Sequence, residues 1–168
     1  MKLDSLEDVL VHQLNDLYSA EDQLVEALPK MAEAASNAEL KQAFQHHHEE
    51  TRDHRDRIQD IFGQLGTRRN GEECKAMKGL IAEGEEVIKT SGGDPAAKDA
   101  ALVAAAQRVE HYEIAAYGTA KTLAGELDLS EVKDILDQTL DEESNADKLL
   151  TKIATGGLMK SGVNEKAR

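Results

Sequence analysis

The sequence predicts an all-α fold, in which four long helices form a bundle and a long crossover contains an additional short helix. The chain of 168 residues has only two prolines and 3% aromatic residues. It is rich in Ala, Glu, Leu and Lys, which favour helices over strands. Apolar residues also recur at helical spacing in five stretches, each with a recognisable start signal.

The first two stretches predict a helical hairpin. One covers about residues 4 to 34 and carries a stripe of leucines, and Pro29 is expected to kink or shorten it. The next opens with Ser36 and Glu39 at the spacing of a capping box and runs to about Leu65. Because only a couple of residues join the two helices, they should pack antiparallel.

The remaining stretches predict the crossover and a second hairpin. A short helix is expected over about residues 71–89, with Asn70 and Glu73 as its caps. The second long pair should consist of a helix over residues 95–126 and, after a turn at residues 128–130, a last helix that extends to about Thr155. Between the two hairpins lie roughly 30 residues, enough to travel back along the bundle, which is the single long crossover of the ferritin-like arrangement.

Composition limits the location and the partners. We expect one domain over residues 1–157 and a flexible basic tail over 158–168. No apolar run approaches the roughly 18 residues of a membrane span, and no secretory pattern begins the chain, so a cytoplasmic protein with no membrane partner is predicted. The single cysteine, Cys74, belongs to no disulfide or zinc pattern. A net charge of −13 argues against nucleic-acid partners.

Ionisable residues interrupt the inward stripes of all four long helices near their midpoints, where antiparallel helices meet at one level. These residues are Glu21, His47, Glu50, His54, Glu110, Glu113, Glu143 and Asp147. Buried carboxylates destabilise a fold unless they are protonated, paired with histidine or neutralised by a metal. Carboxylates combined with imidazoles are typical ligands of iron or manganese, so the sequence predicts a dinuclear site of one of these metals in the bundle core.

Another interpretation of the same residues stays open at this point. A small error in helix phase would turn several of the acids outward, or His47 and His54 would neutralise them in a buried network without metal. His46 and His48 flank the inward stripe and are expected to face solvent, and His111 points to another face than its neighbour in the chain.

Several stretches are shared with a known family. They are residues 17–21, 27–30, 44–51, 109–115 and 142–143. On these stretches, the chain resembles the YciF/YciE family of ferritin-like stress-response proteins over roughly residues 5 to 155. The resemblance implies a ferritin-like bundle that forms a homodimer, with a metal site and no securely established reaction. It implies that the ligands are Glu21, His47, Glu50, Glu110, Glu113 and Glu143.

The sequence departs from the best-known di-iron pattern, in which a histidine follows a glutamate by three residues on two helices. Three residues after Glu50 stands Asp53, and three after Glu143 stands Ala146. The second imidazole expected on the last helix is absent, and Asp147 is its nearest substitute.

Two functional hypotheses follow. The first is a metal-binding stress-response protein whose iron or manganese centre reacts with oxygen or peroxide. In it, Glu50 and a carboxylate of the third long helix bridge the metals, while Glu21, Glu143 and a histidine are terminal ligands. The alternative is a non-catalytic dimeric helical bundle that serves protein interactions and has a vestigial metal site. Neither a phosphate-binding loop nor a nucleophile elbow occurs, so hydrolase and nucleotide-enzyme functions have no support.

Overall fold

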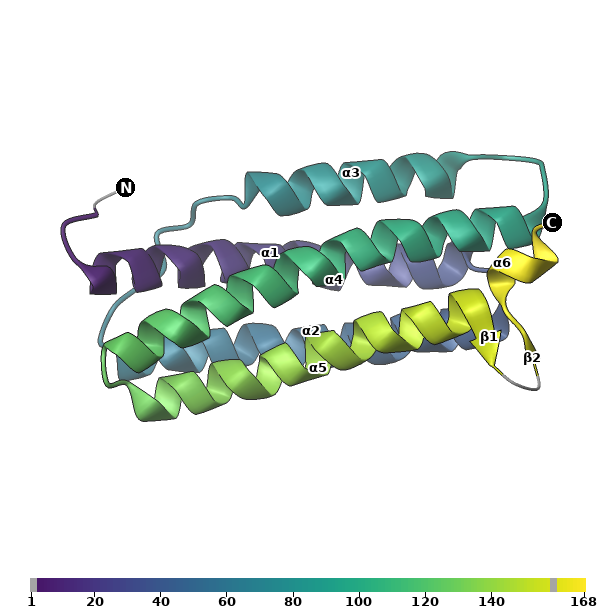
Figure 1. The fold of residues 1–168 in the computed structure, drawn as a ribbon. Helices are drawn as coiled ribbons and strands as arrows, with labels where there is room; N and C mark the ends of the chain where they lie inside the picture. Colours follow the sequence, from purple (N-terminus) through teal and green to yellow (C-terminus); the bar gives the residue numbers. More distant parts are fainter. Residues whose placement is uncertain (1–2, 158–159) are drawn as a thin grey trace.

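Four long helices form an elongated bundle in which neighbouring helices run antiparallel (Figure 1). The computed structural model describes residues 3–157 and 160–168. The bundle consists of α1 (Leu6–Ala34), α2 (Ala38–Gln64), α4 (Pro95–Glu126) and α5 (Ser130–Thr155). A shorter helix, α3 (Lys75–Lys89), lies along α1 and α4 in the crossover from the end of α2 to the start of α4. The predicted fold class is confirmed.

The turn between α1 and α2 is capped differently from our prediction. Asn37 is the N-cap of α2, and its side-chain oxygen accepts hydrogen bonds from the backbone amides of Glu39 and Leu40. The backbone amides of Ser36 and Asn37 instead donate to the two carboxylate oxygens of Asp99 on α4, each at 2.8 Å. This buried carboxylate therefore ties the first hairpin to the second.

The end of α1 agrees with the prediction, whereas the start of the crossover helix differs from it. Pro29 lies inside α1, which continues to Ala34, so the proline does not shorten the helix. The crossover helix begins at Lys75 with Cys74 as its N-cap, later than predicted. Gly71 has a φ of 74°, and this left-handed conformation is incompatible with the first turn of a helix.

The C-terminal residues, expected to be flexible, are partly ordered where the structure describes them. The strands β1 (Gly156–Gly157) and β2 (Lys160–Ser161) pair antiparallel, and the short helix α6 (Val163–Lys166) follows. Val163 is buried in the core, and α6 contacts α4 and α5. A Cβ atom at Gly162 would lie 2.3 Å from the carbonyl oxygen of Ala154, so this close approach requires glycine. Residues 158 and 159 lie outside the described residues, and a domain limit at residue 157 stays a prediction.

The core consists of two apolar clusters with a polar level between them. On α1, Leu17 belongs to one cluster and Leu24 to the other, and the buried Glu21 lies between them. The same order of apolar, ionisable and apolar residues recurs along α2, α4 and α5. The two clusters therefore hold the helices together on both sides of the polar level.

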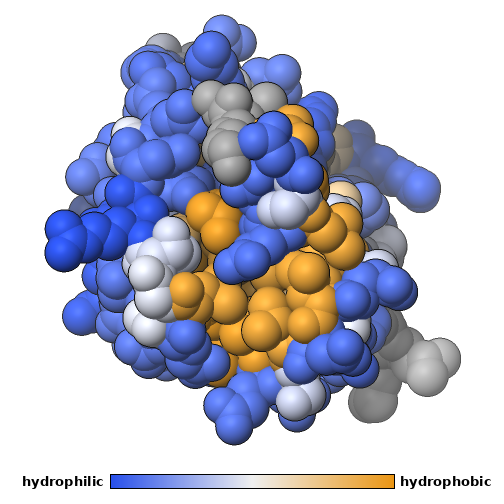
Figure 2. Space-filling view, turned by 90° about the vertical axis from the view of Figure 1, so that its left-hand side faces the viewer, coloured by the Kyte–Doolittle hydropathy of each residue, from blue (hydrophilic) through white to orange (hydrophobic). Residues whose placement is uncertain are grey.

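Apolar side chains also gather on one end of the bundle, where α1 begins, α2 ends and α4 turns into α5 (Figure 2). Leu6, the first residue of α1, is 42% exposed. Within the described residues, no helix is both long enough and apolar enough to cross a membrane. The apolar end lies away from the polar level, which is midway along the bundle.

Candidate metal centre

The polar level brings six buried ionisable side chains together from the four long helices. They are Glu21 of α1, His47 and His54 of α2, Glu110 and Glu113 of α4, and Glu143 of α5. They form a four-residue group (His47, Glu110, Glu113 and Glu143) and a three-residue group (Glu21, His54 and Glu143). Within each group, one ligand atom of every residue lies within 4.8 Å of the others, and Glu143 belongs to both groups.

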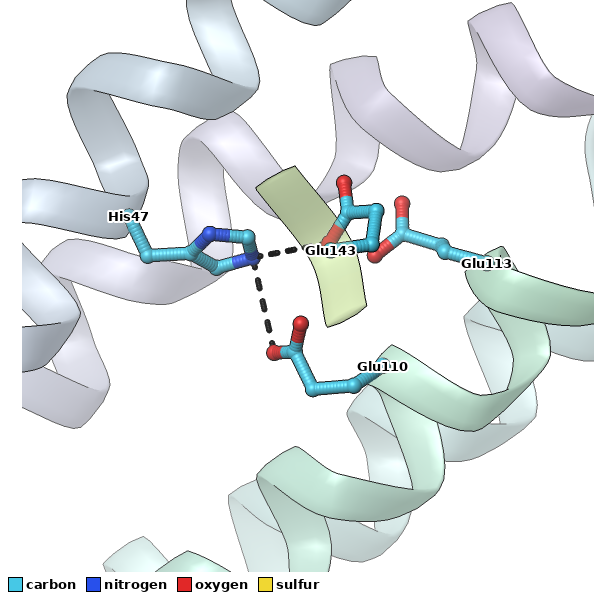
Figure 3. Close-up of side chains that lie close together, drawn as sticks. All are labelled: His47, Glu110, Glu113 and Glu143. Carbon is cyan, nitrogen blue, oxygen red and sulfur yellow. Dashed lines mark ion pairs between the residues drawn. The ribbon is translucent and has the colours of Figure 1, made fainter. Parts of the chain in front are cut away.

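The histidines of α2 contact the carboxylates of the other helices. His47 Nε2 lies 3.4 Å from Glu110 Oε1 and 3.6 Å from Glu143 Oε2 (Figure 3). His54 Nδ1 lies 2.8 Å from Glu143 Oε1 and 3.6 Å from Glu21 Oε1. The two carboxylate oxygens of Glu143 thus face different histidines, which are seven residues apart on α2.

Nine nitrogen and oxygen atoms of these six side chains are buried without a hydrogen-bond partner. They include both carboxylate oxygens of Glu113 and both ring nitrogens of His47. His54 Nδ1 is also among them, because its short contact with Glu143 lacks the direction of a hydrogen bond. An unpartnered buried polar group costs about 1–3 kcal/mol.

A metal ion would bind such atoms. With bonds of roughly 2.0–2.2 Å, ligands on opposite sides of one ion lie about 4.2 Å apart. Both groups are close to this spacing, since their atoms lie within 4.8 Å of one another. The residue types, the spacing of their ligand atoms and the nine atoms without hydrogen-bond partners therefore fit the binding of divalent cations.

Burial raises the pKa of three of the acids. The pKa of Glu113 is well above its ordinary value because the carboxyl is desolvated, and the negative charges of Glu143 and Glu21 raise it further. Burial likewise raises the pKa of Glu110 well above the ordinary value, although His47 opposes the shift. Burial raises the pKa of Glu21 to about 7. Without metal, burial therefore favours the protonated form of these acids.

Ion pairing outweighs burial for the other three groups. Burial would raise the pKa of Glu143, but the positive charges of His47 and His54 lower it below its ordinary value. Burial would lower the pKa of His47, yet Glu110 and Glu143 raise it to about 10. The pKa of His54 is also raised, because its contacts with Glu143 and Glu21 outweigh its burial. Metal binding would have to displace protons from both histidines.

Residues around the two groups orient their side chains. Tyr117 donates a hydrogen bond of 2.5 Å to Glu21 Oε1. His54 Nε2 lies 2.8 Å from a carboxylate oxygen of Glu142, and Arg57 donates to both oxygens of that carboxylate. Because Glu142 accepts from Nε2, the other ring nitrogen of His54 faces the centre, as is usual for metal-binding histidines.

Sequence reasoning missed Glu142 and Arg57. Arg57 follows His54 by three residues and so lies on the same face of α2, a signal that was available. Burial would raise the pKa of Glu142, but its hydrogen bonds, first of all with Arg57, lower it to about 2. This pairing joins residues 85 positions apart and could not be read from one sequence.

Two of the predicted ligands lie outside both groups. Glu50 is partly exposed, and its Oε2 is 3.5 Å from His47 Nδ1 and 3.7 Å from His46 Nδ1. Asp147 is partly exposed and pairs with His111 at 3.3 Å. Asp147 follows Glu143 by four residues, and this step rotates the side-chain direction by about 40° around the helix axis. The rotation moves Asp147 away from the buried face of α5 that carries Glu143.

The chain matches known proteins along nearly its whole length. Residues 5–167 match the family described as a domain of unknown function (DUF892). Protein YciF of Escherichia coli (strain K12) is 44% identical over 166 residues, which make up 98% of this chain and 99% of that protein.

Solved structures agree with this relationship. The crystal structure of the E. coli stress protein YciF superposes with a TM-score of 0.86 and 46% identity, over 89% of this chain and 94% of that one. The protein YcfI of Rhodopseudomonas palustris gives a TM-score of 0.86 and 42% identity, over 91% and 97% of the two chains. This chain therefore belongs to the DUF892 family, together with Protein YciF.

Proposed function

We propose that this protein binds a pair of iron or manganese ions in the middle of its bundle. The four-residue group would hold one ion, the three-residue group the other, and Glu143 would bridge them. The observation that carries the proposal is the set of nine buried ligand atoms without hydrogen-bond partners, which all belong to these residues. Glu50, which sequence reasoning assigned as a bridge, lies at the edge of the centre, and Glu143 takes that place in the proposal.

The ligand types favour these metals. Each group combines one imidazole with carboxylates, and neither contains a thiolate, which suits iron or manganese better than structural zinc. A pair of such ions supplies electrons to oxygen or peroxide when bound. The protein would contribute an enclosed centre between two apolar clusters and a fixed orientation of His54 and Glu21.

The biological setting is an extension of this proposal. Since the E. coli relative is described as a stress protein, we place this chain in the stress response as well. The ferritin-like function, the homodimer and the cytoplasmic location that we expected from the sequence stay predictions.

Metal content tests the proposal directly. Protein from cells supplied with iron and manganese would be analysed for metals, and metal-free protein would then be titrated anaerobically with ferrous iron. The wild type should bind about two ions per chain. Glu143→Gln should bind fewer, because it removes the shared carboxylate. Glu33→Gln, the same change at an exposed position of α1, is the matched control.

The reaction is tested by admitting oxygen or peroxide to the ferrous protein. A change in visible absorbance that Glu143→Gln lacks would support redox chemistry at this centre. A folded wild type that takes up no metal would refute the proposal and favour a structural role for the buried acids.

A further inference from the structure

A pocket between α2 and α5 leads from the surface to the four-residue group. Its volume is about 130 Å³, and both His47 and Glu110 contribute to its lining. Roughly 10–15 Å³ is enough space for one water molecule, so the pocket has room for several. The volume of the pocket is therefore sufficient for a partly hydrated divalent cation.

One wall of the pocket is a continuous row of ligand side chains whose exposure falls from the surface inward. The exposed fraction is 66% for His46, 30% for Glu50, 7% for His47 and 2% for Glu110. Glu50 Oε2 lies 3.7 Å from His46 Nδ1 and 3.5 Å from His47 Nδ1. His47 Nε2 then lies 3.4 Å from Glu110 Oε1. A cation moving along this wall would never be far from a ligand atom.

The His47 ring joins the pocket to the centre. One ring nitrogen faces Glu50 at the mouth and the other faces the buried carboxylates. The side chain is more than nine-tenths buried, and neither nitrogen has a hydrogen-bond partner. No hydrogen bond therefore competes for either nitrogen, and an incoming ion can bind the ring once it has displaced a proton.

The rest of the lining is mixed. It includes Glu142 and Asn145 of α5 together with the apolar side chains of Phe44, Ala146, Leu149 and Leu150. The carboxylate of Glu142 is already held by Arg57 and His54. Apolar walls of low polarizability also strengthen the attraction between a cation and the carboxylates beside it, because they keep water away from the charges. The path therefore has a row of ligand side chains along one wall, and both polar and apolar residues along the rest.

We propose that divalent cations reach the centre through this pocket, and that Glu50 and His46 form a transient binding position at its mouth. The inference rests on the proposed metal centre and adds its route of loading. It also accounts for the position of Glu50, which lies beside the centre and outside both ligand groups.

The rate of metal loading tests the route. Metal-free protein would be mixed with cobalt(II), whose visible absorption reports binding to imidazole and carboxylate ligands, in a stopped-flow instrument. Glu50→Gln removes the charge at the mouth, and Ala146→Leu narrows the pocket from the α5 side. Each variant should load about tenfold more slowly than the wild type, while the final absorbance stays the same.

Matched controls separate this effect from general ones. Glu33→Gln makes the same charge change at an exposed position of α1, and Ala115→Leu makes the same size change at an exposed position of α4. Both should load at the wild-type rate. Circular dichroism before mixing confirms that each variant is folded, and if Ala146→Leu is not, the result for Glu50→Gln decides.

The outcomes distinguish the route from the centre. Wild-type rates for Glu50→Gln and Ala146→Leu, with full final binding, would overturn the route and leave the centre intact. A lower final absorbance for Glu50→Gln would make Glu50 a permanent ligand and overturn its transient role. A wild type that binds no cobalt would overturn both proposals.

Discussion

Replacing Glu113 by methionine should stabilise the metal-free protein and reduce its stabilisation by metal, because the four-residue group loses one of its ligands. Glu113 is 0% exposed, and neither of its carboxylate oxygens has a hydrogen-bond partner. Burial raises its pKa well above the ordinary value and so favours the neutral form. An unsatisfied buried polar group costs the fold about 1–3 kcal/mol. Methionine is flexible and of similar length, so it can fill the same space without that cost.

The size of the effect can be stated as a melting temperature. A gain of about 2 kcal/mol in the free energy of unfolding raises Tm by roughly 4–8 °C in a chain of this length. A ligand at about 100 times its Kd stabilises a protein by about 2.7 kcal/mol, which is a rise of roughly 5–11 °C. Without metal the variant should therefore unfold at a higher temperature than the wild type, and metal should raise its Tm by less than it raises the Tm of the wild type.

Thermal unfolding followed by circular dichroism, in EDTA and in excess manganese(II), measures both effects. Glu113→Gln is the control, because it keeps a polar group of the same shape and should weaken the metal effect without gaining stability. A lower Tm for Glu113→Met in EDTA would refute the conclusion that this carboxyl is unpartnered. A metal-dependent rise in that variant as large as the rise in the wild type would refute the role of Glu113 as a ligand.

The other predictions concern the hairpin turn and pH. Asp99→Ala should lower the free energy of unfolding by about 2 kcal/mol, because the amides of Ser36 and Asn37 lose their charged acceptor. Urea unfolding measures this loss of stability. A loss below about 0.5 kcal/mol would contradict the prediction. Metal affinity should rise with pH across neutrality, because metal displaces protons that groups with raised pKa values hold. The pKa of Glu21 is raised to about 7 and that of His47 to about 10, so both carry protons below pH 7 that metal binding must release. Calorimetry in two buffers of different ionisation enthalpy measures this release, and a binding heat independent of the buffer would argue against it.

The helices that were predicted well are those with strong local signals. The predicted range 95–126 coincides with α4, and the predicted end near Thr155 coincides with that of α5. A proline in the first turn of α4 and a pair of glycines after α5 mark these limits in the sequence itself. The cap of α2 was predicted less well, since Ser36 and Asn37 are both good caps. The choice between them involves Asp99, which is 62 residues beyond Asn37.

The centre shows the same division between local and distant information. Helical periodicity placed six of the eight predicted ligands at the buried polar level. It also placed Glu50 and Asp147 on the inward stripe, although both side chains are partly exposed. The apolar stripe of a helix is broad, so its edge contains half-buried positions that periodicity alone does not separate from buried ones. Contacts between helices, such as that of Arg57 with Glu142, depend on how each helix is rotated in the bundle.

The energetics of the polar level explain why metal-free and metal-loaded protein must be compared. Nine unpartnered atoms at even about 1 kcal/mol each would cost as much as the whole stability of a typical domain, about 5–15 kcal/mol. The apolar clusters on both sides must offset this cost, since they hold the helices in register whether or not the ligands have a partner. Protons reduce the cost by neutralising acids such as Glu110 and Glu113. A bound cation would reduce it further by giving the unpartnered atoms a partner, so the stability gained on adding metal measures how far the centre is built for that ion.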